Sequence, residues 1–254
     1  MSNLRVGFIG LGNMGILMAK NMVRNGERLV VYDLRKEAMS ETVSLGATAA
    51  GSSREVAAAC DVIFSVVRDE PQNDEVIFGL NGVWQGIKEG STLIISSTIS
   101  PGYCRNVYAR GKERGIYVID APVSAESRNF TPGQESAVLT LMIGGDEEAV
   151  MRCMPVFKAL AKNIFHLGSI GSGQVCKLVN NLQGYGNEVF ARECINIGLK
   201  AGLPFDQMVA AIRVSTGFSR GMNVLVRRLR KPPVAPGPAE KVQLKNIDDK
   251  DRHK

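Results

Sequence analysis

The length, composition and charge of the chain restrict its class before any motif is considered. It has 254 residues, of which 44% are hydrophobic and 22% are charged; these values are typical of a globular protein and exclude disorder, collagen or a coiled coil throughout. The formal net charge is +6, and residues 227–254 hold nine basic against four acidic residues, so the rest of the chain is nearly neutral. A nearly neutral body is unlike a nucleic-acid-binding protein, and we expect no nucleic-acid partner.

The cysteines and the apolar runs indicate a compartment. The five cysteines are odd in number and form no Cys-x-x-Cys pair, which is typical of reduced thiols in the cytoplasm. With only two histidines, no metal site is expected. No apolar run approaches about 18 residues, the length of a membrane-spanning helix, and no targeting peptide is expected before the first predicted strand. These features together predict a cytoplasmic protein that does not bind a membrane.

Short runs rich in Val and Ile alternate with helix-like stretches up to Gly168. They predict strands at residues 4–9, 29–32, 62–67, 92–96, 117–121, 138–143 and 164–167. Between them, helices are predicted at residues 14–24, 36–45, 101–114 and 146–160. Several of the strands are continuously hydrophobic, as strands buried on both faces are. The alternation predicts an α/β fold, with a Rossmann-type, mostly parallel sheet.

The pattern changes after Gly168, and no further strand is indicated. A long helix is predicted at residues 172–201 and a second at residues 204–214. The chain then becomes basic and rich in proline from Arg227, which predicts an extended linker followed by a short terminal element. We therefore expect an α/β domain at residues 1–164 and an all-helical domain at residues 172–254.

A glycine-rich loop joins the first predicted strand to the first predicted helix. Its sequence is Gly10-Leu11-Gly12-Asn13-Met14-Gly15. In such a loop the first glycine makes the tight turn, the second lets the backbone approach a pyrophosphate, and the third lets the helix lie close to the strand. The N–H groups at the helix start then face the phosphates. A nucleotide-free α/β domain with a glycine turn is the alternative.

Asp33 follows the second predicted strand, 18 residues after Gly15. A carboxylate at this place can accept hydrogen bonds from the ribose hydroxyls of a dinucleotide and repels a 2′-phosphate. It therefore favours NAD over NADP as the cofactor. Arg35 and Lys36 lie nearby, and either could neutralise a phosphate, which weakens this preference.

Further motifs follow in order along the chain: Ser97-Thr98-Ile99-Ser100-Pro101, Asp120-Ala121-Pro122-Val123-Ser124, the run from Gly171 to Asn181 that contains Lys177, and Lys245-Asn246-Ile247. Together with the glycine loop, they resemble the motifs of the β-hydroxyacid dehydrogenase family. That family includes 3-hydroxyisobutyrate dehydrogenase, tartronate semialdehyde reductase and glyoxylate reductase. The resemblance spans almost the whole chain and implies hydride transfer between nicotinamide and a small hydroxyacid or its carbonyl partner.

The chemistry of the implied catalytic residues can also be argued directly. Lys177 and Asn181 are four residues apart, so they share a face of the predicted helix. An ammonium group can protonate a developing alkoxide, and an amide can orient the same substrate. In the oxidation direction the amine must start neutral, for which a lowered pKa is useful. A solvated helix lysine is the alternative role for Lys177.

The resemblance also implies the remaining site residues. Ser124 contacts the substrate, the alternative being turn chemistry after Pro122. The implied cofactor-binding residues are Gly10, Leu11, Gly12, Asn13, Met14, Gly15, Asp33, Val67, Thr98 and Lys245. Thr98 could instead cap the helix predicted from Pro101, although Ser100 fills that position better. Lys245 could be a solvated lysine, because its motif is degraded.

The sequence departs from the family in two places. The family usually continues Gly-Gly after Ser124, whereas this chain has Ala125 and Glu126, followed by a longer loop at residues 127–136. A carboxylate there repels an acidic substrate, although Arg128 could offset it, so we expect an altered substrate. The chain also stops nine residues after Lys245, where the family continues as helices, so either the helical domain is shortened or the sequence is a truncated product. A shortened helical domain would expose apolar surface, which predicts a homodimer or a larger homo-oligomer.

Other functions remain open at this point. A catalytically inactive NAD-binding scaffold, with a basic tail that engages an anionic partner, would share the same first domain. An imine-reducing relative usually lacks the lysine that Lys177 provides. A phosphogluconate-type enzyme would need a longer chain.

Overall fold

The computed structural model describes residues 3–125 and 138–230. The chain divides into two compact units, Met1–Val179 and Asn180–Lys254. The division falls inside the long helix α7 (Ser172–Lys200), whereas the sequence predicted a boundary between residues 164 and 172. The first turns of α7 belong to the first unit because they are hydrogen-bonded to it, as described below.

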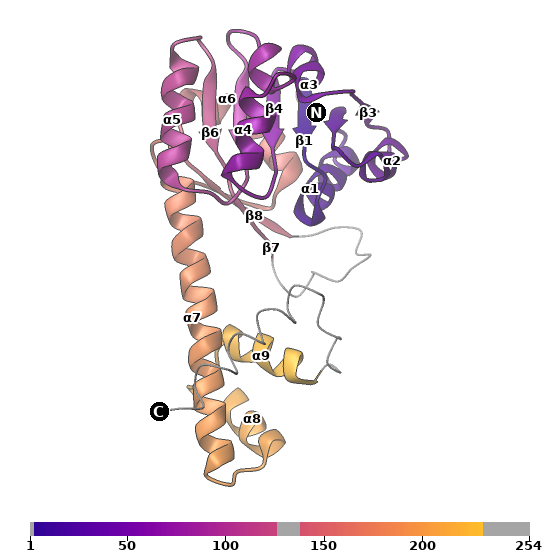
Figure 1. Ribbon diagram of the computed structural model, residues 1–254. Helices are drawn as coiled ribbons and strands as arrows, with labels where there is room; N and C mark the ends of the chain where they lie inside the picture. The colour runs from indigo at the N-terminus through magenta and orange to yellow at the C-terminus, as the bar shows by residue number, and fades with distance from the viewer. Residues whose placement is uncertain (1–2, 126–137, 231–254) are drawn as a thin grey trace, which may run out of the picture. The chain divides into compact units, whose positions relative to one another are not determined.

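The first unit is built on a six-stranded parallel sheet (Figure 1). Its strands are β1 (Val6–Ile9), β2 (Leu29–Tyr32), β3 (Thr48–Ala49), β4 (Val62–Ser65), β5 (Thr92–Ile95) and β6 (Tyr117–Asp120). Their order in the sheet is β3-β2-β1-β4-β5-β6, so the chain winds outward in both directions from β1. This is the Rossmann-type arrangement that the sequence predicted.

Helices cover both faces of this sheet, and alternate strand residues point to different cores. Phe64 of β4 packs into one core with Phe8 and Phe157, and its ring centroid lies 5.6 Å from that of Phe8. Ile63 belongs to the opposite core. The helices are α1 (Asn13–Arg24), α2 (Lys36–Val43), α3 (Ser53–Ala59), α4 (Glu70–Phe78), α5 (Pro101–Lys112) and α6 (Glu147–Leu160), with a 3-10 turn at Val83–Gln85.

A second, three-stranded sheet lies beside the carboxyl end of β6. It consists of β7 (Val123–Ala125), β8 (Leu139–Ile143) and β9 (Asn163–His166), with β7 antiparallel and β9 parallel to β8. The sequence predicted strands at β8 and β9 but missed β7, which has only three residues. It also did not separate the two sheets, because strand periodicity carries no information about which strands pair.

The sequence analysis missed β3 and three short helices, α3, α4 and α9. Capping signals for two of these helices were nevertheless present. Ser52 caps α3 by accepting a hydrogen bond from the N–H of Glu55, while Glu55 accepts one from the N–H of Gly51. Asp69 caps α4 in the same way, through the N–H of Gln72. Both helices are shorter than ten residues, so their hydrophobic period is weak.

The second unit contains the rest of α7, α8 (Phe205–Arg213) and α9 (Arg220–Arg230). Its core consists of buried side chains from all three helices: Ala191, Ile195, Met208, Val209, Met222, Leu225 and Val226. Arg227–Arg230 complete α9 rather than beginning the predicted linker, and the later residues of that prediction lie outside the described residues. None of the described helices is long and apolar enough to cross a membrane.

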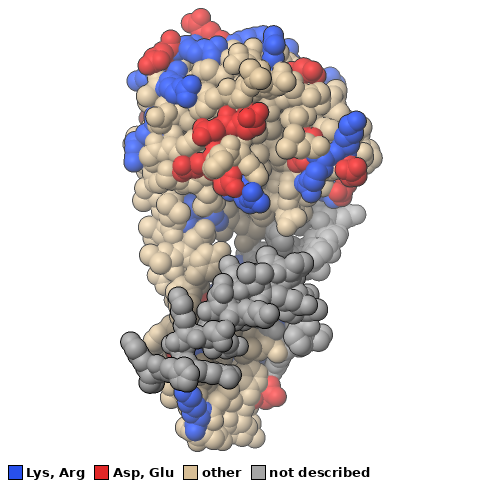
Figure 2. All heavy atoms as spheres, viewed as in Figure 1, with Lys and Arg blue, Asp and Glu red and all other residues tan. Residues whose placement is uncertain are grey.

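The face of the first unit seen in Figure 2 carries both signs of charge. Red and blue side chains both occur there, among a larger area of uncharged side chains. This agrees with the nearly neutral composition of the chain before residue 227.

Candidate functional site

The glycine loop after β1 has two glycines that the fold itself requires. Gly10 has φ of 94°, a conformation that favours glycine, and a Cβ atom built there would lie 2.4 Å from the carbonyl oxygen of Val66. A Cβ on Gly15 would lie 2.1 Å from the carbonyl oxygen of Gly10. Any side chain at either place would therefore collide with backbone.

Gly12 is different, because a Cβ built on it meets nothing within 4 Å. It is the exposed N-cap residue of α1 and makes no side-chain capping bond. The helix start is thus open to a ligand, with unpaired backbone N–H groups and the positive end of the helix dipole. This arrangement fits a pyrophosphate.

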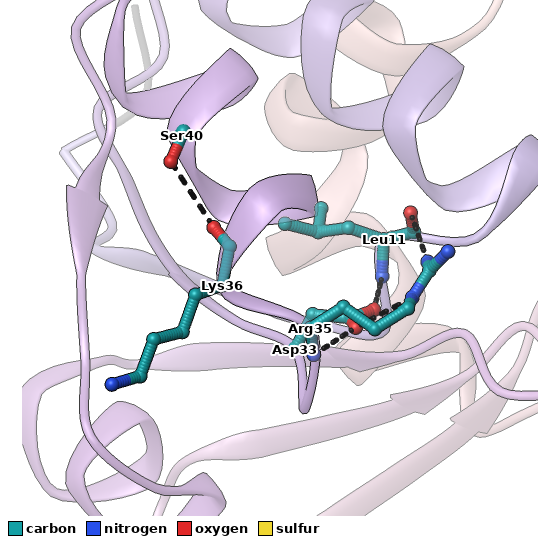
Figure 3. Close-up of polar contacts among 5 residues, drawn as sticks. All are labelled: Leu11, Asp33, Arg35, Lys36 and Ser40. Atoms are coloured by element: carbon teal, nitrogen blue, oxygen red, sulfur yellow. Dashed lines mark hydrogen bonds and ion pairs between the residues drawn. The ribbon is translucent and has the colours of Figure 1, made fainter.

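Asp33 is fastened to the loop by hydrogen bonds (Figure 3). Its Oδ2 accepts a hydrogen bond of 2.7 Å from the N–H of Leu11, and its Oδ1 accepts one of 2.8 Å from the N–H of Arg35. The Arg35 side chain donates to Oδ1 at 3.2 Å and to the carbonyl oxygen of Leu11 at 3.1 Å. Lys36 points away from this group of residues in the figure.

The charge of Asp33 is stabilised in this setting. Burial alone would raise the pKa of Asp33, but hydrogen bonds from the backbone of Arg35 and Leu11, and the Arg35 guanidinium, outweigh it and lower that pKa. The carboxylate is therefore ionised at neutral pH. It still has lone pairs to offer a ribose hydroxyl, since donors within residues 3–125 and 138–230 use three of its acceptor directions.

A cavity of about 410 Å³ lies over the carboxyl ends of β1, β2 and β4. Its lining includes four residues that the sequence predicted to bind a cofactor: Gly10, Gly12, Asp33 and Val67. The sequence analysis missed other lining residues, among them Tyr32, Arg68, Gln72 and Val76. Gln72 and Val76 belong to α4, which was not predicted. Tyr32 and Arg68 could have been found from the sequence, because they lie at or shortly after the ends of β2 and β4.

A second group of residues lies at the ends of β4, β5 and β6. Val67 donates its backbone N–H to the Oγ of Ser97, at 3.1 Å. Thr98 is exposed, and Ser100 rather than Thr98 caps α5, as predicted, through the N–H of Tyr103. The side chain of Gln174 spans Thr98: it donates to the carbonyl oxygen of Ser97 and accepts from the N–H of Ile99.

Lys177 lies one turn after Gln174 on α7. It is half-buried, and burial lowers the pKa of its amine from the ordinary lysine value. This is the direction that acid–base exchange near neutral pH requires. Ser124 is half-buried in β7, opposite Thr140 of β8.

Two implied site residues fall outside this unit. Asn181 belongs to the second unit, where it is half-buried and its Oδ1 accepts a hydrogen bond of 3.4 Å from the side chain of Asn180. Lys245, like Glu126 and Arg128, lies outside the described residues.

Sequence reasoning gave Asp120 and Gln174 no role, although both are fully buried at this edge of the sheet. The Asp120 carboxylate accepts hydrogen bonds from the N–H groups of Gly171 and Gln174. Two signals were available: Asp120 is a charged residue at the end of a continuously hydrophobic strand, and both residues lie within the motifs that carry the family resemblance.

Comparisons with known proteins place this geometry in context. Residues 5–168 match the family described as the NAD binding domain of 6-phosphogluconate dehydrogenase. The 2-hydroxy-3-oxopropionate reductase of Escherichia coli is 36% identical over 234 residues, which cover 92% of this chain and 78% of that protein. A probable mitochondrial 3-hydroxyisobutyrate dehydrogenase of Dictyostelium discoideum is 35% identical over 215 residues, 85% of this chain. The chain spans 66% of the length of that relative.

A solved structure is similar over almost the whole chain. The 3-hydroxyisobutyrate dehydrogenase of Mycobacterium tuberculosis, determined with L-serine, has a TM-score of 0.77 and 28% sequence identity. The match covers 95% of this chain and 80% of that one.

Proposed function

The chain belongs to the β-hydroxyacid dehydrogenase family, and from that premise we propose that it transfers a hydride between a nicotinamide dinucleotide and a small hydroxyacid or its semialdehyde or keto partner. The observation that carries the proposal is the half-buried amine of Lys177, whose pKa is lowered. Lys177 lies on α7, which is hydrogen-bonded through the side chain of Gln174 to the backbone on either side of Thr98. The glycine loop, on the same edge of the sheet, supports binding of the dinucleotide there.

The first unit is an NAD-binding domain. We propose that the open helix start at Gly12 holds the pyrophosphate and that Asp33 accepts a hydrogen bond from the adenosine ribose. The ionised Asp33 supports a preference for NAD, because a second negative charge from a 2′-phosphate would be repelled. Asn13 and Met14 complete the proposed phosphate contact through the backbone of the first turn of α1, whereas Leu11 is proposed to hold Asp33 in place at the cofactor site through the N–H that it donates to that carboxylate.

Lys177 is the proposed general acid and base. When bound, the nicotinamide supplies or accepts the hydride at the substrate carbon. During reduction, the Lys177 ammonium donates a proton to the oxygen that gains negative charge. During oxidation, its neutral amine accepts the hydroxyl proton, and the lowered pKa makes that neutral form more available. Ser124 and Asn181 are proposed to orient the substrate, and Val67, Thr98 and Lys245 to contact the cofactor.

The substrate is proposed to be a small hydroxyacid that differs from those of the named relatives. Ala125 ends β7 where the family has glycine, and the carboxylate of Glu126 follows it in the sequence. A substrate with less negative charge, or one with a cationic group, suits this sequence better than a dicarboxylate.

We also propose that the protein is a homodimer or a larger homo-oligomer. In the second unit, α7 exposes Leu182 (75%), Tyr185 (66%) and Val189 (61%), which recur at helical spacing and so share one face. Apolar surface of this kind marks an interface in soluble proteins.

Replacing Lys177 tests the proposed chemistry. The Lys177→Met variant keeps the length of the side chain and removes the proton donor, so kcat is expected to fall by about 10²–10⁴-fold. NADH affinity, measured by fluorescence titration, should stay unchanged. Wild type and variant would be assayed with NADH or NADPH against a panel of small semialdehydes and 2-keto acids.

The outcomes separate the enzyme from its main alternative. A Lys177→Met variant as active as wild type would contradict the assigned role of the lysine. A wild-type protein that binds NADH and reduces no member of the panel would favour the inactive scaffold.

A further inference from the structure

The start of α7 is fastened to the end of β6 by a buried carboxylate. Asp120 is 0% exposed; its Oδ1 accepts a hydrogen bond of 2.6 Å from the N–H of Gly171, and its Oδ2 accepts one of 2.7 Å from the N–H of Gln174. These donors are the otherwise unpaired N–H groups of a helix start. A single side chain from the sheet thus caps the helix that carries Lys177.

Glycines allow this close approach. A Cβ built on Gly173 would lie 2.3 Å from the carbonyl oxygen of Met142 and 2.8 Å from Oδ2 of Asp120. A Cβ built on Gly144 would lie 2.4 Å from Oδ1 of the same carboxylate. Side chains at these two positions would therefore prevent the first turn of α7 and the carboxylate from approaching this closely.

Gln174 fastens the same turn of α7 to the end of β5. Its side chain is 0% exposed, donates a hydrogen bond of 2.7 Å to the carbonyl oxygen of Ser97, and accepts one of 3.1 Å from the N–H of Ile99. These two groups lie on either side of Thr98. Ser97 in turn accepts a hydrogen bond from the N–H of Val67 at the end of β4. Three neighbouring strand ends are thus connected to one helical turn.

Lys177 follows Gln174 by three residues, so the two side chains leave the same side of α7, one turn apart. We propose that Asp120 and Gln174 are positioning residues that hold the Lys177 amine at a fixed place and burial relative to the turn at Thr98. The inference rests on the proposed function, in which the Lys177 amine is the general acid and base. Neither residue needs to touch the substrate.

The chemistry of Asp120 agrees with a positioning role. Burial raises the pKa of its carboxyl to about 6, although hydrogen bonds from Gly171 and Gln174 oppose the rise. A buried carboxylate with a raised pKa lowers the stability of the fold at neutral pH. An ionised carboxylate does, however, accept hydrogen bonds from both N–H groups at once. Its negative charge also stabilises the helix start, which is the positive end of the helix dipole.

The test uses Gln174→Met, which keeps the length of the side chain and removes both of its hydrogen bonds. Asn25→Leu is the matched control, because the Asn25 side chain also makes two hydrogen bonds to backbone, with Asn21 and Ala159, at the C-terminal end of α1. Asp120→Asn is a second variant, in which the amide oxygen can accept only some of the bonds of the carboxylate.

Two properties are measured on the full-length protein. The first is kcat beside the Kd for NADH; we expect kcat to fall by about 10- to 100-fold in Gln174→Met, which is more than the Kd rises, because Thr98 is one of several proposed cofactor contacts whereas Lys177 is the one proposed proton donor. The second is the pH midpoint for acetylation of Lys177 by acetic anhydride, read by peptide mass spectrometry. In wild type we expect it below the ordinary lysine value of about 10.4, and in Gln174→Met shifted up towards it.

The labelling measurement needs no turnover, so it separates this inference from the proposed function. A raised midpoint in Gln174→Met and Asp120→Asn, with no change in Asn25→Leu, supports the positioning role even if no substrate is turned over. An unchanged midpoint, with only a lower melting temperature in all three variants, overturns it and leaves Asp120 and Gln174 as structural residues.

Discussion

Asp33 combines two tasks in one carboxylate. It holds the glycine loop through the N–H of Leu11, and it presents a negative charge to the cavity. The positive guanidinium of Arg35 offsets the negative charge of Asp33 only in part, because it donates hydrogen bonds both to Asp33 and to the carbonyl oxygen of Leu11. The choice between NAD and NADP therefore depends on the balance between one fixed carboxylate and one cation that can turn.

Replacing Asp33 by Asn should shift this balance towards NADP. Two charges about 4 Å apart repel by roughly 1–4 kcal/mol near a protein surface, so the affinity for NADPH relative to NADH should rise at least about fivefold. The Kd values of both cofactors, measured by fluorescence titration, check this. Lys36→Ala is the control, since Lys36 points away from the site in Figure 3 and its removal should leave the ratio unchanged. An unaltered ratio in Asp33→Asn would refute the assignment.

Sequence reasoning located single residues better than the bonds between them. Asp33 and Lys177 were predicted as site residues because each occupies a defined place in a local pattern, and their roles stay predictions. The role of Asp120 was not predicted, since its hydrogen bonds reach Gly171 and Gln174, 51 and 54 residues away. The hydrophobic periodicity of a single segment carries no information about contacts between residues so far apart in the sequence.

At the scale of the elements, α7 is a continuous helix with two different environments. Its first turn is enclosed by backbone at Gly173, whereas a Cβ on Gly184 would meet nothing within 4 Å. The packing therefore requires glycine at position 173, whereas it would admit a side chain at position 184. The long helix was predicted because no proline interrupts residues 172–201; α3 and α4 were missed because they are too short for a hydrophobic period to repeat.

The substitution Gly173→Ala should destabilise the first unit. Its methyl group would overlap the carbonyl oxygen of Met142 and the carboxylate of Asp120, and overpacking of this kind costs about 1–3 kcal/mol. The midpoint of thermal unfolding should fall by several degrees, at roughly 2–4 °C per kcal/mol. Gly184→Ala should raise it slightly, because alanine stabilises a helix interior by about 0.5–1 kcal/mol relative to glycine. Equal midpoints for the two variants would show that α7 does not approach β6 this closely.

At the scale of the whole molecule, the sequence correctly predicted the α/β sheet and the helical segment after it. The pairing of strands into two sheets could not be predicted, because β6 and β7 are separated by only two residues and the local pattern does not show where the direction changes. Oligomeric state remains a prediction from the exposed face of α7.

That prediction can be checked by light scattering. If the α7 face of the second unit joins two copies, the wild-type mass should be at least twice the 27.5 kDa of the chain. The double variant Leu182→Glu, Val189→Glu should shift it towards the monomer mass, because negative charges without a partner would be buried at the interface. Leu80→Glu is the control, since Leu80 is 92% exposed in the first unit. A wild-type protein that is monomeric at every concentration would disprove the proposal.

The central claim is that a nicotinamide dinucleotide bound at the glycine loop gives up its hydride beside Lys177. A single turnover with NADH deuterated at its transferable hydrogen tests it most directly, with the products of a panel of small semialdehydes and 2-keto acids analysed by mass spectrometry. We expect deuterium on the carbinol carbon of at least one product with wild-type protein, and a much slower appearance with Lys177→Met. Bound NADH that leaves every product free of deuterium would contradict the claim.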